Sequence, residues 1–293
     1  MPSLNDVTVI VVTRDSAHCL QGLDPLLSQC RQVIISDNAS TDGTADQAAT
    51  LWPHAQVLRH DRNLGFGAAN NRALERVATP WAFLLNPDCA VTVPQLGELL
   101  AVSEQWPDAS VIAPQLVGVD GMLEVNYRWP RTAWEAQGPE AQGPLCVGFV
   151  CGAAMLMRLE RFEGIGFFDE RFFLYHEDDD LCLRLFQARR ALIVVPSVHA
   201  VHRSRGSARG ASPWRHEYVR GYHHAQSKLI FAVKHGTVSQ AVGERRRLLC
   251  LTLLVLPLRI LAFSPRMIAR MWGRLRGLLD WRVDAGPAGR GQA

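Results

Sequence analysis

The sequence predicts an α/β protein with a doubly wound, mostly parallel sheet of the Rossmann-like kind and a C-terminal helical extension. Two observations lead to the sheet. Over residues 1–90, short apolar runs alternate with segments whose apolar residues recur at helical spacing. The connections are short, which is typical of parallel strands joined by helices. The extension is predicted over residues 213–284, where apolar helical patterns are interspersed with arginine.

Four strands are expected in the N-terminal part, within residues 7–12, 32–36, 55–60 and 81–86. The first is an unbroken β-branched run, which fits a strand that is buried on both faces. Helical segments are expected between the strands, within residues 16–30, 37–52 and 63–78. Ser40 and Asp42 are suitable caps for the second helix.

Polar side chains follow these strands, at the point where each strand ends. Asp15, Asp37, Asn63 and Asp88 all occupy such positions. Because ligands of parallel α/β sheets bind beyond the carboxyl ends of the strands, the four side chains should lie at one cleft.

Further along the chain, an acidic cluster is expected to open a helix. We expect a strand over 153–157, a short helix over 159–162, a helix over 180–188 and a strand over 192–195. The cluster consists of Glu177, Asp178, Asp179 and Asp180. It should occupy the first turn of the 180–188 helix, where the helix dipole favours anions and neighbouring carboxylates disfavour them.

The predicted organisation is a catalytic domain over 1–212, with a nucleotide half at about 1–90 and an acceptor half at about 91–212, then a helical region over 213–284 and a disordered tail over 285–293. The formal net charge of +3 is too small to indicate a nucleic-acid partner. Seven cysteines without a CxxC pair indicate reduced thiols in a cytoplasmic protein. The N-terminus shows no signal-peptide pattern.

Each candidate motif has a structural alternative. Asp37 could bind a ribose or base, or could only form an Asx turn. Asp88, after Asn86 and Pro87, could bind Mg²⁺ or Mn²⁺, or could belong to a simple turn. His202 could complete the metal site, or could be structural, and His199 is the weaker candidate of the two histidines.

Two loops extend the candidate site. Arg203, Arg205 and Ser207 could bind a diphosphate. Trp129, Arg131 and Trp134 precede a tandem EAQGP repeat, and this loop could hold an acceptor or could be a mobile surface insertion.

The C-terminal region contains an apolar run over 248–263 that is interrupted by Pro257 and Arg259 and flanked by arginines. The run is too short for a bilayer span of roughly 20 residues. It suits a helix lying on an anionic membrane surface, or alternatively a helix packed on the domain or in a homodimer interface.

Six motifs in order, "VTVIVVTRDS", "VIISDNASTDGT", "NLGFGAANNRAL", "FLLNPDCAV", the segment around "YHEDDDLCLRL" and "VHRSRGS", resemble the family 2 inverting glycosyltransferases, in particular their rhamnosyltransferase-like branch. The resemblance covers about residues 6–210. It implies a GT-A fold, a nucleotide-diphosphate sugar donor and a divalent metal, Mg²⁺ or Mn²⁺.

The resemblance also implies roles for individual residues. Asp178 is the expected catalytic base, with Glu177 beside it; Asp88 and His202 are the expected metal ligands. The expected donor-binding residues are Thr13, Asp15, Asp37, Asn38, Asn63, Gly65 and Asn86, and the expected acceptor-binding residues include Cys151 and Gly152. Asp180 is expected to cap or hydrogen-bond the start of its helix, and Asp179 is expected to be solvated. Arg14 and Asp179 depart from the family pattern.

The implied activity is inverting transfer of a sugar to a saccharide or polyprenyl-linked acceptor in cell-surface polysaccharide synthesis, by an enzyme on the cytoplasmic face of the cell membrane. The expected donor is dTDP-rhamnose; a UDP-hexose or UDP-galactofuranose is the alternative. A nucleotidyltransferase is disfavoured, because "TRDSAHCL" contains no glycine- and basic-rich loop after the first strand. A non-catalytic binding module would not require the whole acidic cluster.

Overall fold

The computed structural model describes residues 2–124, 127–128, 141–203 and 213–283. Some predicted site residues lie outside these ranges, namely Trp129, Arg131, Trp134, Arg205 and Ser207. The predicted disordered tail also lies outside the described residues.

The chain divides into two compact units. The first comprises Met1–Asn63, Ala69–Phe168 and Leu181–Ala208. The second comprises Leu64–Ala68, Asp169–Asp180 and Arg209–Ala293. The acidic cluster therefore groups with the C-terminal helices, whereas the sequence placed it in a domain over 1–212.

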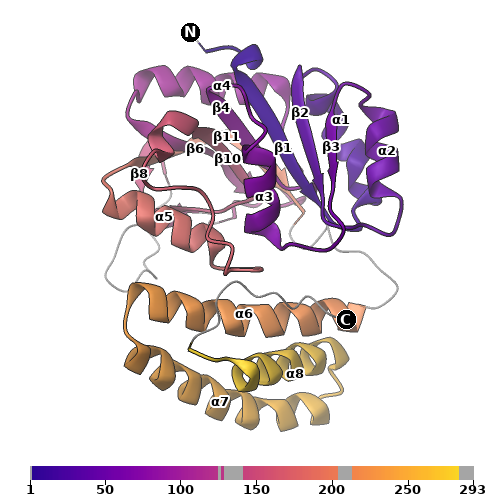
Figure 1. Cartoon of the computed structure of the whole chain (residues 1–293), viewed down its shortest axis with the longest axis vertical. Coiled ribbons are helices and arrows are strands. Elements are labelled where there is room, and N and C mark those ends of the chain that lie inside the picture. The colour runs from indigo at the N-terminus through magenta and orange to yellow at the C-terminus, as the bar shows by residue number, and fades with distance from the viewer. Residues whose placement is uncertain (1, 125–126, 129–140, 204–212, 284–293) are drawn as a thin grey trace. The chain divides into compact units, whose positions relative to one another are not determined.

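Within the described residues, a nine-stranded sheet forms the first unit's centre (Figure 1). Its order is β3-β2-β1-β4-β10-β6-β11-β5, and β8 pairs with β11 at one side. The strands are β1 (Val7–Thr13), β2 (Gln32–Asp37), β3 (Gln56–Arg59), β4 (Trp81–Leu85), β5 (Cys89–Ala90), β6 (Ala109–Val117), β8 (Leu145–Val147), β10 (Ala154–Arg158) and β11 (Ala191–His202). A separate two-stranded sheet joins β7 (Tyr127–Arg128) to β9 (Phe149–Val150).

The N-terminal half of the sheet confirms the predicted parallel arrangement. β3, β2, β1 and β4 all run in the same direction. Every residue of β1 is buried, as the unbroken β-branched run predicts. Thr13 pairs with Asp37 at the carboxyl ends of β1 and β2, so the loops that follow these strands begin side by side.

The other half of the sheet is mixed. β10 lies between β4 and β6 and is antiparallel to both, whereas β6 and β11 are parallel. β11 is also longer than the predicted strand over 192–195, because it continues past an irregularity between Val195 and His199. His199 and His202 therefore lie on the strand and not after it.

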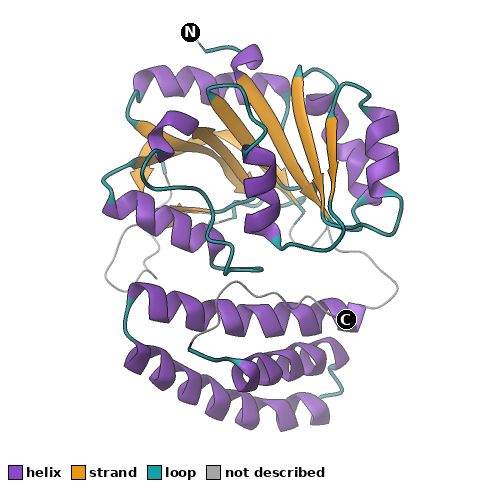
Figure 2. Cartoon of the chain, in the orientation of Figure 1, coloured by secondary structure: helices purple, strands orange, loops and turns teal. Residues whose placement is uncertain are grey.

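Helices cover the sheet of the first unit (Figure 2). They are α1 (Leu20–Leu27), α2 (Thr44–Leu51), α3 (Phe66–Leu74), α4 (Val93–Gln105) and α5 (Glu177–Gln187), of which α3 and α5 begin in the second unit. Short 3-10 turns span Leu4–Asp6, Ala17–Cys19 and Leu159–Phe162. Leu23, Leu96 and Phe83 belong to the buried cluster that joins the helices to the strands.

In the second unit, three helices pack against one another: α6 (Pro213–His235), α7 (Val238–Leu261) and α8 (Pro265–Asp280). α6 and α8 approach closely at glycines. A Cβ on Gly221 would collide with the carbonyl of Arg270, and one on Gly273 with the carbonyl of Tyr218. α7 continues through Pro257, so this proline interrupts the apolar sequence but does not end the helix.

Candidate active site

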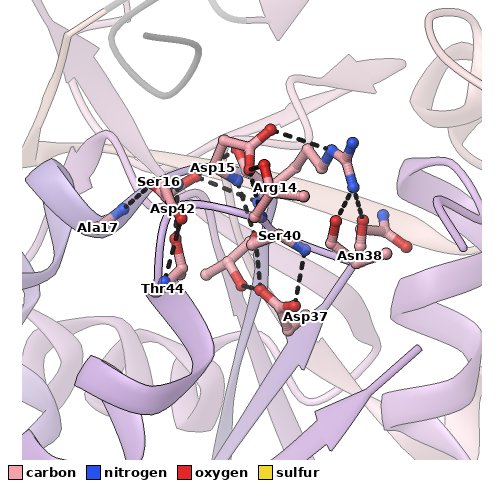
Figure 3. A network of polar contacts seen from close by, with 12 residues as sticks. Arg14, Asp15, Ser16, Ala17, Asp37, Asn38, Ser40, Asp42 and Thr44 are labelled. Carbon is pink, nitrogen blue, oxygen red and sulfur yellow. Dashed lines mark hydrogen bonds and ion pairs between the residues drawn. The ribbon is translucent and has the colours of Figure 1, made fainter. Parts of the chain in front are cut away.

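The loops after β1 and β2 are joined by a polar network, which Figure 3 shows. Asp37 is almost fully buried, and its carboxylate accepts hydrogen bonds from Thr13 Oγ1 at 2.9 Å and from Ser40 N at 2.9 Å. Ser40 Oγ donates to the same carboxylate at 2.6 Å. The Asp37 carboxylate therefore closes the turn that follows β2 and is held in place where β2 ends.

Asp15 and Arg14 connect the two loops further (Figure 3). Asp15 has a backbone φ of 48°, and its Oδ1 accepts a hydrogen bond from Thr41 N at 2.7 Å. The Arg14 guanidinium donates to the carbonyls of Asn38 and Ala39 and lies 3.3 Å from Asp15 Oδ2. The residue that departs from the family pattern thus ties the β1 loop to the β2 loop.

Asp88 and His202 lie together, as predicted. Antiparallel pairing of β5 with β11 places His202 opposite Cys89, and Arg203 N donates to the Asp88 carbonyl at 2.8 Å. His202 Nε2 is 3.7 Å from Asp88 Oδ1, and both side chains are largely buried. His202 Nδ1 is 3.1 Å from Glu124 Oε2. The sequence did not single out Glu124, which stands in an ordinary polar loop.

A carboxylate and an imidazole at this separation are suitable ligands for a divalent cation. Further oxygen ligands, from a bound substrate or from water, would have to complete the coordination shell of the cation. In the described part of the chain, no group of three or more His, Cys, Asp or Glu side chains is gathered as a metal site.

The remaining predicted donor and acceptor residues fall at several places. Asn63 is the last residue of the first segment of the first unit, whereas Gly65 belongs to the second unit. A Cβ at Gly65 would collide with the carbonyl of Phe173, so the backbones approach closely there. Asn86 N donates to the carbonyl of Ala153 at 2.9 Å, which ties the turn after β4 to the start of β10. Cys151 and Gly152 lie in the turn immediately before β10.

The acidic cluster forms the first turn of α5, as predicted, but its four carboxylates differ in exposure. Asp178 is the half-exposed member, whereas Glu177, Asp179 and Asp180 are buried. Burial, and then the neighbouring Asp178 and Asp179 carboxylates, raise the pKa of Glu177 well above its ordinary value. Its buried Oε2 has no hydrogen-bond partner among the described residues.

The predicted solvated position of Asp179 is wrong, and Asp180 has partners that the sequence did not predict. Asp179 is buried, not solvated, and its Oδ2 lies 3.0 Å from His176 Nδ1. Asp180 Oδ1 lies 2.6 Å from Lys234 Nζ and 2.7 Å from His235 Nε2, at the end of α6. The sequence missed both α6 partners, because charged residues at a helix C-terminus usually face solvent.

The backbone before the cluster is strained. Tyr175 and His176 have φ values of 69° and 65°, in the left-handed region that bulky residues rarely adopt. Such conformations cost on the order of 1–3 kcal/mol each and persist when surrounding contacts enforce them. Rings from α6 supply such contacts, since His224 packs against both Tyr175 and His176.

Comparison with known proteins gives a consistent result. The sequence profile described as glycosyl transferase family 2 matches residues 8–166. The chain is 30% identical over 234 residues to the N-acetylglucosaminyl-diphospho-decaprenol L-rhamnosyltransferase of Mycobacterium tuberculosis, a match that covers 69% of this chain and 75% of that relative.

Solved structures share the fold at low identity. One is the mannosyltransferase PcManGT from Pyrobaculum calidifontis in complex with GDP-Man and Mn²⁺, at 14% identity and a TM-score of 0.54, covering 95% of this chain and 88% of that one. Another is GalNAc-T7 with UDP, GalNAc and Mn²⁺, at 14% identity and a TM-score of 0.52, covering 81% of this chain and 56% of that one. The predicted GT-A-type fold is thereby confirmed.

Proposed function

Because the chain belongs to glycosyl transferase family 2, we propose that it transfers a rhamnosyl group from dTDP-rhamnose to a saccharide acceptor in cell-surface polysaccharide synthesis. The observation that carries the proposal is the match to this family over residues 8–166. Within the matched residues, Asp37 lies at the end of a strand of the sheet and Asp88 lies shortly after another. The choice of sugar is supported by the relative named as a rhamnosyltransferase. A UDP-hexose or UDP-galactofuranose donor is the alternative.

The donor nucleotide binds to the paired loops after β1 and β2. Asp37, held by Thr13 and Ser40, offers a fixed carboxylate to a ribose hydroxyl or base N–H. Asp15 and Asn38 belong to the same network, and Asn63, Gly65 and Asn86 are the further donor-binding candidates. Arg203, Arg205 and Ser207 are proposed to contact the diphosphate.

A divalent ion, Mg²⁺ or Mn²⁺, would be held by Asp88 and His202. When bound, it neutralises negative charge on the diphosphate leaving group. The support is the chemistry of the two side chains and the Mn²⁺ that is present in the two similar solved structures. Asp88 contributes an anionic oxygen, and Glu124 orients the His202 ring through Nδ1.

The transfer is a single displacement that inverts the anomeric carbon. Asp178 accepts the proton of the acceptor hydroxyl while its oxygen bonds to the anomeric carbon, and the bond from that carbon to the diphosphate oxygen breaks. Asp178 suits this role because it is the half-exposed carboxylate of the cluster. Glu177, whose pKa is raised by burial and by the neighbouring Asp178, lies beside it as a positioning neighbour.

The acceptor is a saccharide linked to a polyprenyl diphosphate, by analogy with the substrate in the relative's name. Trp129, Arg131, Trp134, Cys151 and Gly152 are the acceptor-binding candidates. The enzyme acts at the cytoplasmic face of the cell membrane as a peripheral protein, and it could be a homodimer.

The test is transfer of radiolabelled sugar from dTDP-rhamnose and from UDP-sugars to a polyprenyl-diphosphate saccharide. Asp178→Asn should keep donor binding, measured by calorimetry, but lose at least about a hundredfold in transfer rate, because the general base is removed. Asp46→Asn, at an exposed carboxylate, is the control and should transfer at the wild-type rate. Near-wild-type transfer by Asp178→Asn would exclude Asp178 as the base.

A further inference from the structure

The last turns of α7 and the connection to α8 expose several large apolar side chains. The buried residues of α7 are Ala241, Leu248 and Thr252, and none follows Thr252. We call residues 253–263 the hairpin tip, since they end α7 and lead into α8. Its exposed large apolar side chains are Leu253, Leu254, Leu258, Ile260, Leu261 and Phe263, the last 89% exposed.

A cluster of exposed apolar residues of this kind normally marks an interaction site. A helix that packs only on its own unit would keep one polar face toward water. The hairpin tip has only one charged residue, Arg259, so its sequence offers no such polar face. Some apolar environment outside the described contacts should therefore cover it.

The charge around the hairpin tip indicates which environment this is. Between Glu244 and Asp280 there is no acidic residue. The same segment contains Arg245, Arg246, Arg247, Arg259, Arg266, Arg270, Arg274 and Arg276. Some are engaged within the unit, such as Arg245, which donates to the Leu278 carbonyl, but Arg246, Arg259 and Arg266 are exposed.

Aromatic residues line a groove between the start of α6 and the start of α8. The open cavity of about 430 Å³ is lined by Trp214, Arg215, Tyr218, Pro265, Ile268, Ala269 and Trp272. Trp214 and Trp272 are each about half exposed. Tryptophan and tyrosine are enriched where a protein crosses from the apolar to the headgroup layer of a membrane.

We propose that the hairpin tip inserts into the headgroup–acyl boundary of an anionic lipid bilayer, with the surrounding arginines at the lipid phosphates and the Trp214–Trp272 groove at the interface. No helix in the described residues is long and apolar enough to cross a bilayer, so the insertion is shallow. Anionic lipids fit because an acid-free, arginine-rich surface is attracted to their headgroups.

A second copy of the chain is the competing occupant of this surface. In a two-fold dimer the same patch faces itself, which would bring the exposed arginines of both copies together. With no acidic residue between Glu244 and Asp280, the patch carries no opposite charge of its own to compensate. Charge therefore favours lipid over a second copy.

This inference deepens the proposed function, because a lipid-linked acceptor would be presented at the same membrane surface. It names the segment that makes the contact and the lipid chemistry that the segment recognises. Neither point requires that the sugar or the nucleotide be identified.

The test is cosedimentation of the full chain with vesicles of phosphatidylglycerol and phosphatidylcholine, compared with phosphatidylcholine alone. The wild-type chain should bind the anionic vesicles at least about tenfold more strongly, and salt should weaken this binding. Leu254→Ser/Leu261→Ser should weaken it by at least about tenfold, because two inserting apolar side chains are lost.

Met122→Ser/Val119→Ser is the matched control, since its two side chains are equally exposed (69% and 73%, against 68% and 74% for Leu254 and Leu261). Control and wild-type chains should bind alike. Equal binding by the tip variant, or no preference for anionic vesicles, would overturn the inference. So would a vesicle-independent dimer that the tip substitutions dissociate, measured by sedimentation velocity.

A water-soluble saccharide acceptor separates this inference from the proposed function. If the tip variant binds vesicles poorly but still transfers sugar to that acceptor, the membrane-binding inference and the proposed function are both supported. If the wild-type chain binds anionic vesicles and transfers none of the tested sugars, the proposed function fails and the membrane surface stands. If it transfers sugar and binds no vesicles, the membrane surface fails alone.

Discussion

At the residue scale, the first turn of α5 combines one half-exposed carboxylate with three buried ones. Asp180 lies next to the Lys234 cation and next to His235, and Asp179 lies next to His176, so both carboxylates have a nitrogen-bearing neighbour. Glu177 is the exception, because neither a cation nor a hydrogen bond to its Oε2 is found in the described chain. A protonated Glu177 would avoid an uncompensated buried charge beside Asp178.

Glu177 should make the stability of the protein depend on pH. Its pKa in the folded protein lies above the ordinary 4.5, so between these values the folded state binds more protons than the unfolded chain. The free energy of unfolding contributed by Glu177 is therefore full below pH 4.5 and is lost as pH rises through the folded pKa. Glu177→Gln removes this loss, so the variant should gain stability over wild type as the pH rises from about 4 through the folded pKa.

Urea unfolding over that pH range measures the difference. The exposed Glu98→Gln on α4 is the control and should follow the wild-type pH dependence. If Glu177→Gln and wild type keep a constant difference across the range, Glu177 is not protonated preferentially in the folded state.

At the scale of elements, an ion network inside the second unit connects α6 to the first turn of α5. Lys234 Nζ lies 2.6 Å from both Asp180 Oδ1 and Asp169 Oδ2, and Arg171 pairs with Asp169 at 2.6 Å. Arg171 and Lys234 together hold the pKa of Asp169 well below its ordinary value, against the opposing effect of burial. The network fixes the turn that carries Asp178.

Removing Lys234 should therefore destabilise the protein. Lys234→Met leaves Asp180, which is fully buried, with only His235 of its two partners on α6, and we expect a loss of about 3 kcal/mol in the free energy of unfolding. Lys234→Met/Asp180→Asn removes both charges and should lose less than the sum of its single variants, with a coupling of about 1 kcal/mol or more.

Urea unfolding of the two single variants and the double variant measures this coupling. The exposed pair Arg59–Asp46 provides the control cycle, and its coupling should be below about 1 kcal/mol. Additive losses at Lys234 and Asp180 would mean that the two side chains do not stabilise each other.

The sequence predicted the local part of this architecture and missed the non-local part. The strands β1 to β4 and the acidic first turn of α5 are determined mainly by residues that are close in the sequence, so their local sequence patterns were sufficient to predict them. The direction of β10 and the full length of β11 depend on pairing with distant strands, which no local pattern encodes. Lys234 and His235 follow Asp180 by more than fifty residues, so their role also required the structure.

At the scale of the whole molecule, binding of the donor should raise the stability of the folded chain by mass action. At about a hundred times the dissociation constant, the gain is about 2.7 kcal/mol. dTDP-rhamnose with Mn²⁺ should therefore raise the melting temperature more than either component alone or a UDP-sugar with Mn²⁺. The metal-dependent part of this shift should disappear in Asp88→Ala, because the carboxylate proposed to bind the metal beside His202 is removed.

Thermal-shift measurements with and without Mn²⁺ separate the contribution of the nucleotide sugar from that of the metal. Each shift is taken relative to the melting temperature of the same variant without ligand, so a change in the stability of the variant itself does not affect the comparison. Asp108→Ala, at a side chain that is 86% exposed, is the control and should keep the full shift. An unchanged Mn²⁺-dependent shift in Asp88→Ala would place the metal elsewhere. An equal shift with every nucleotide sugar would show that the site recognises the diphosphate and not the base. In that case the loops that Arg14 connects would position Asp37 without selecting the nucleotide.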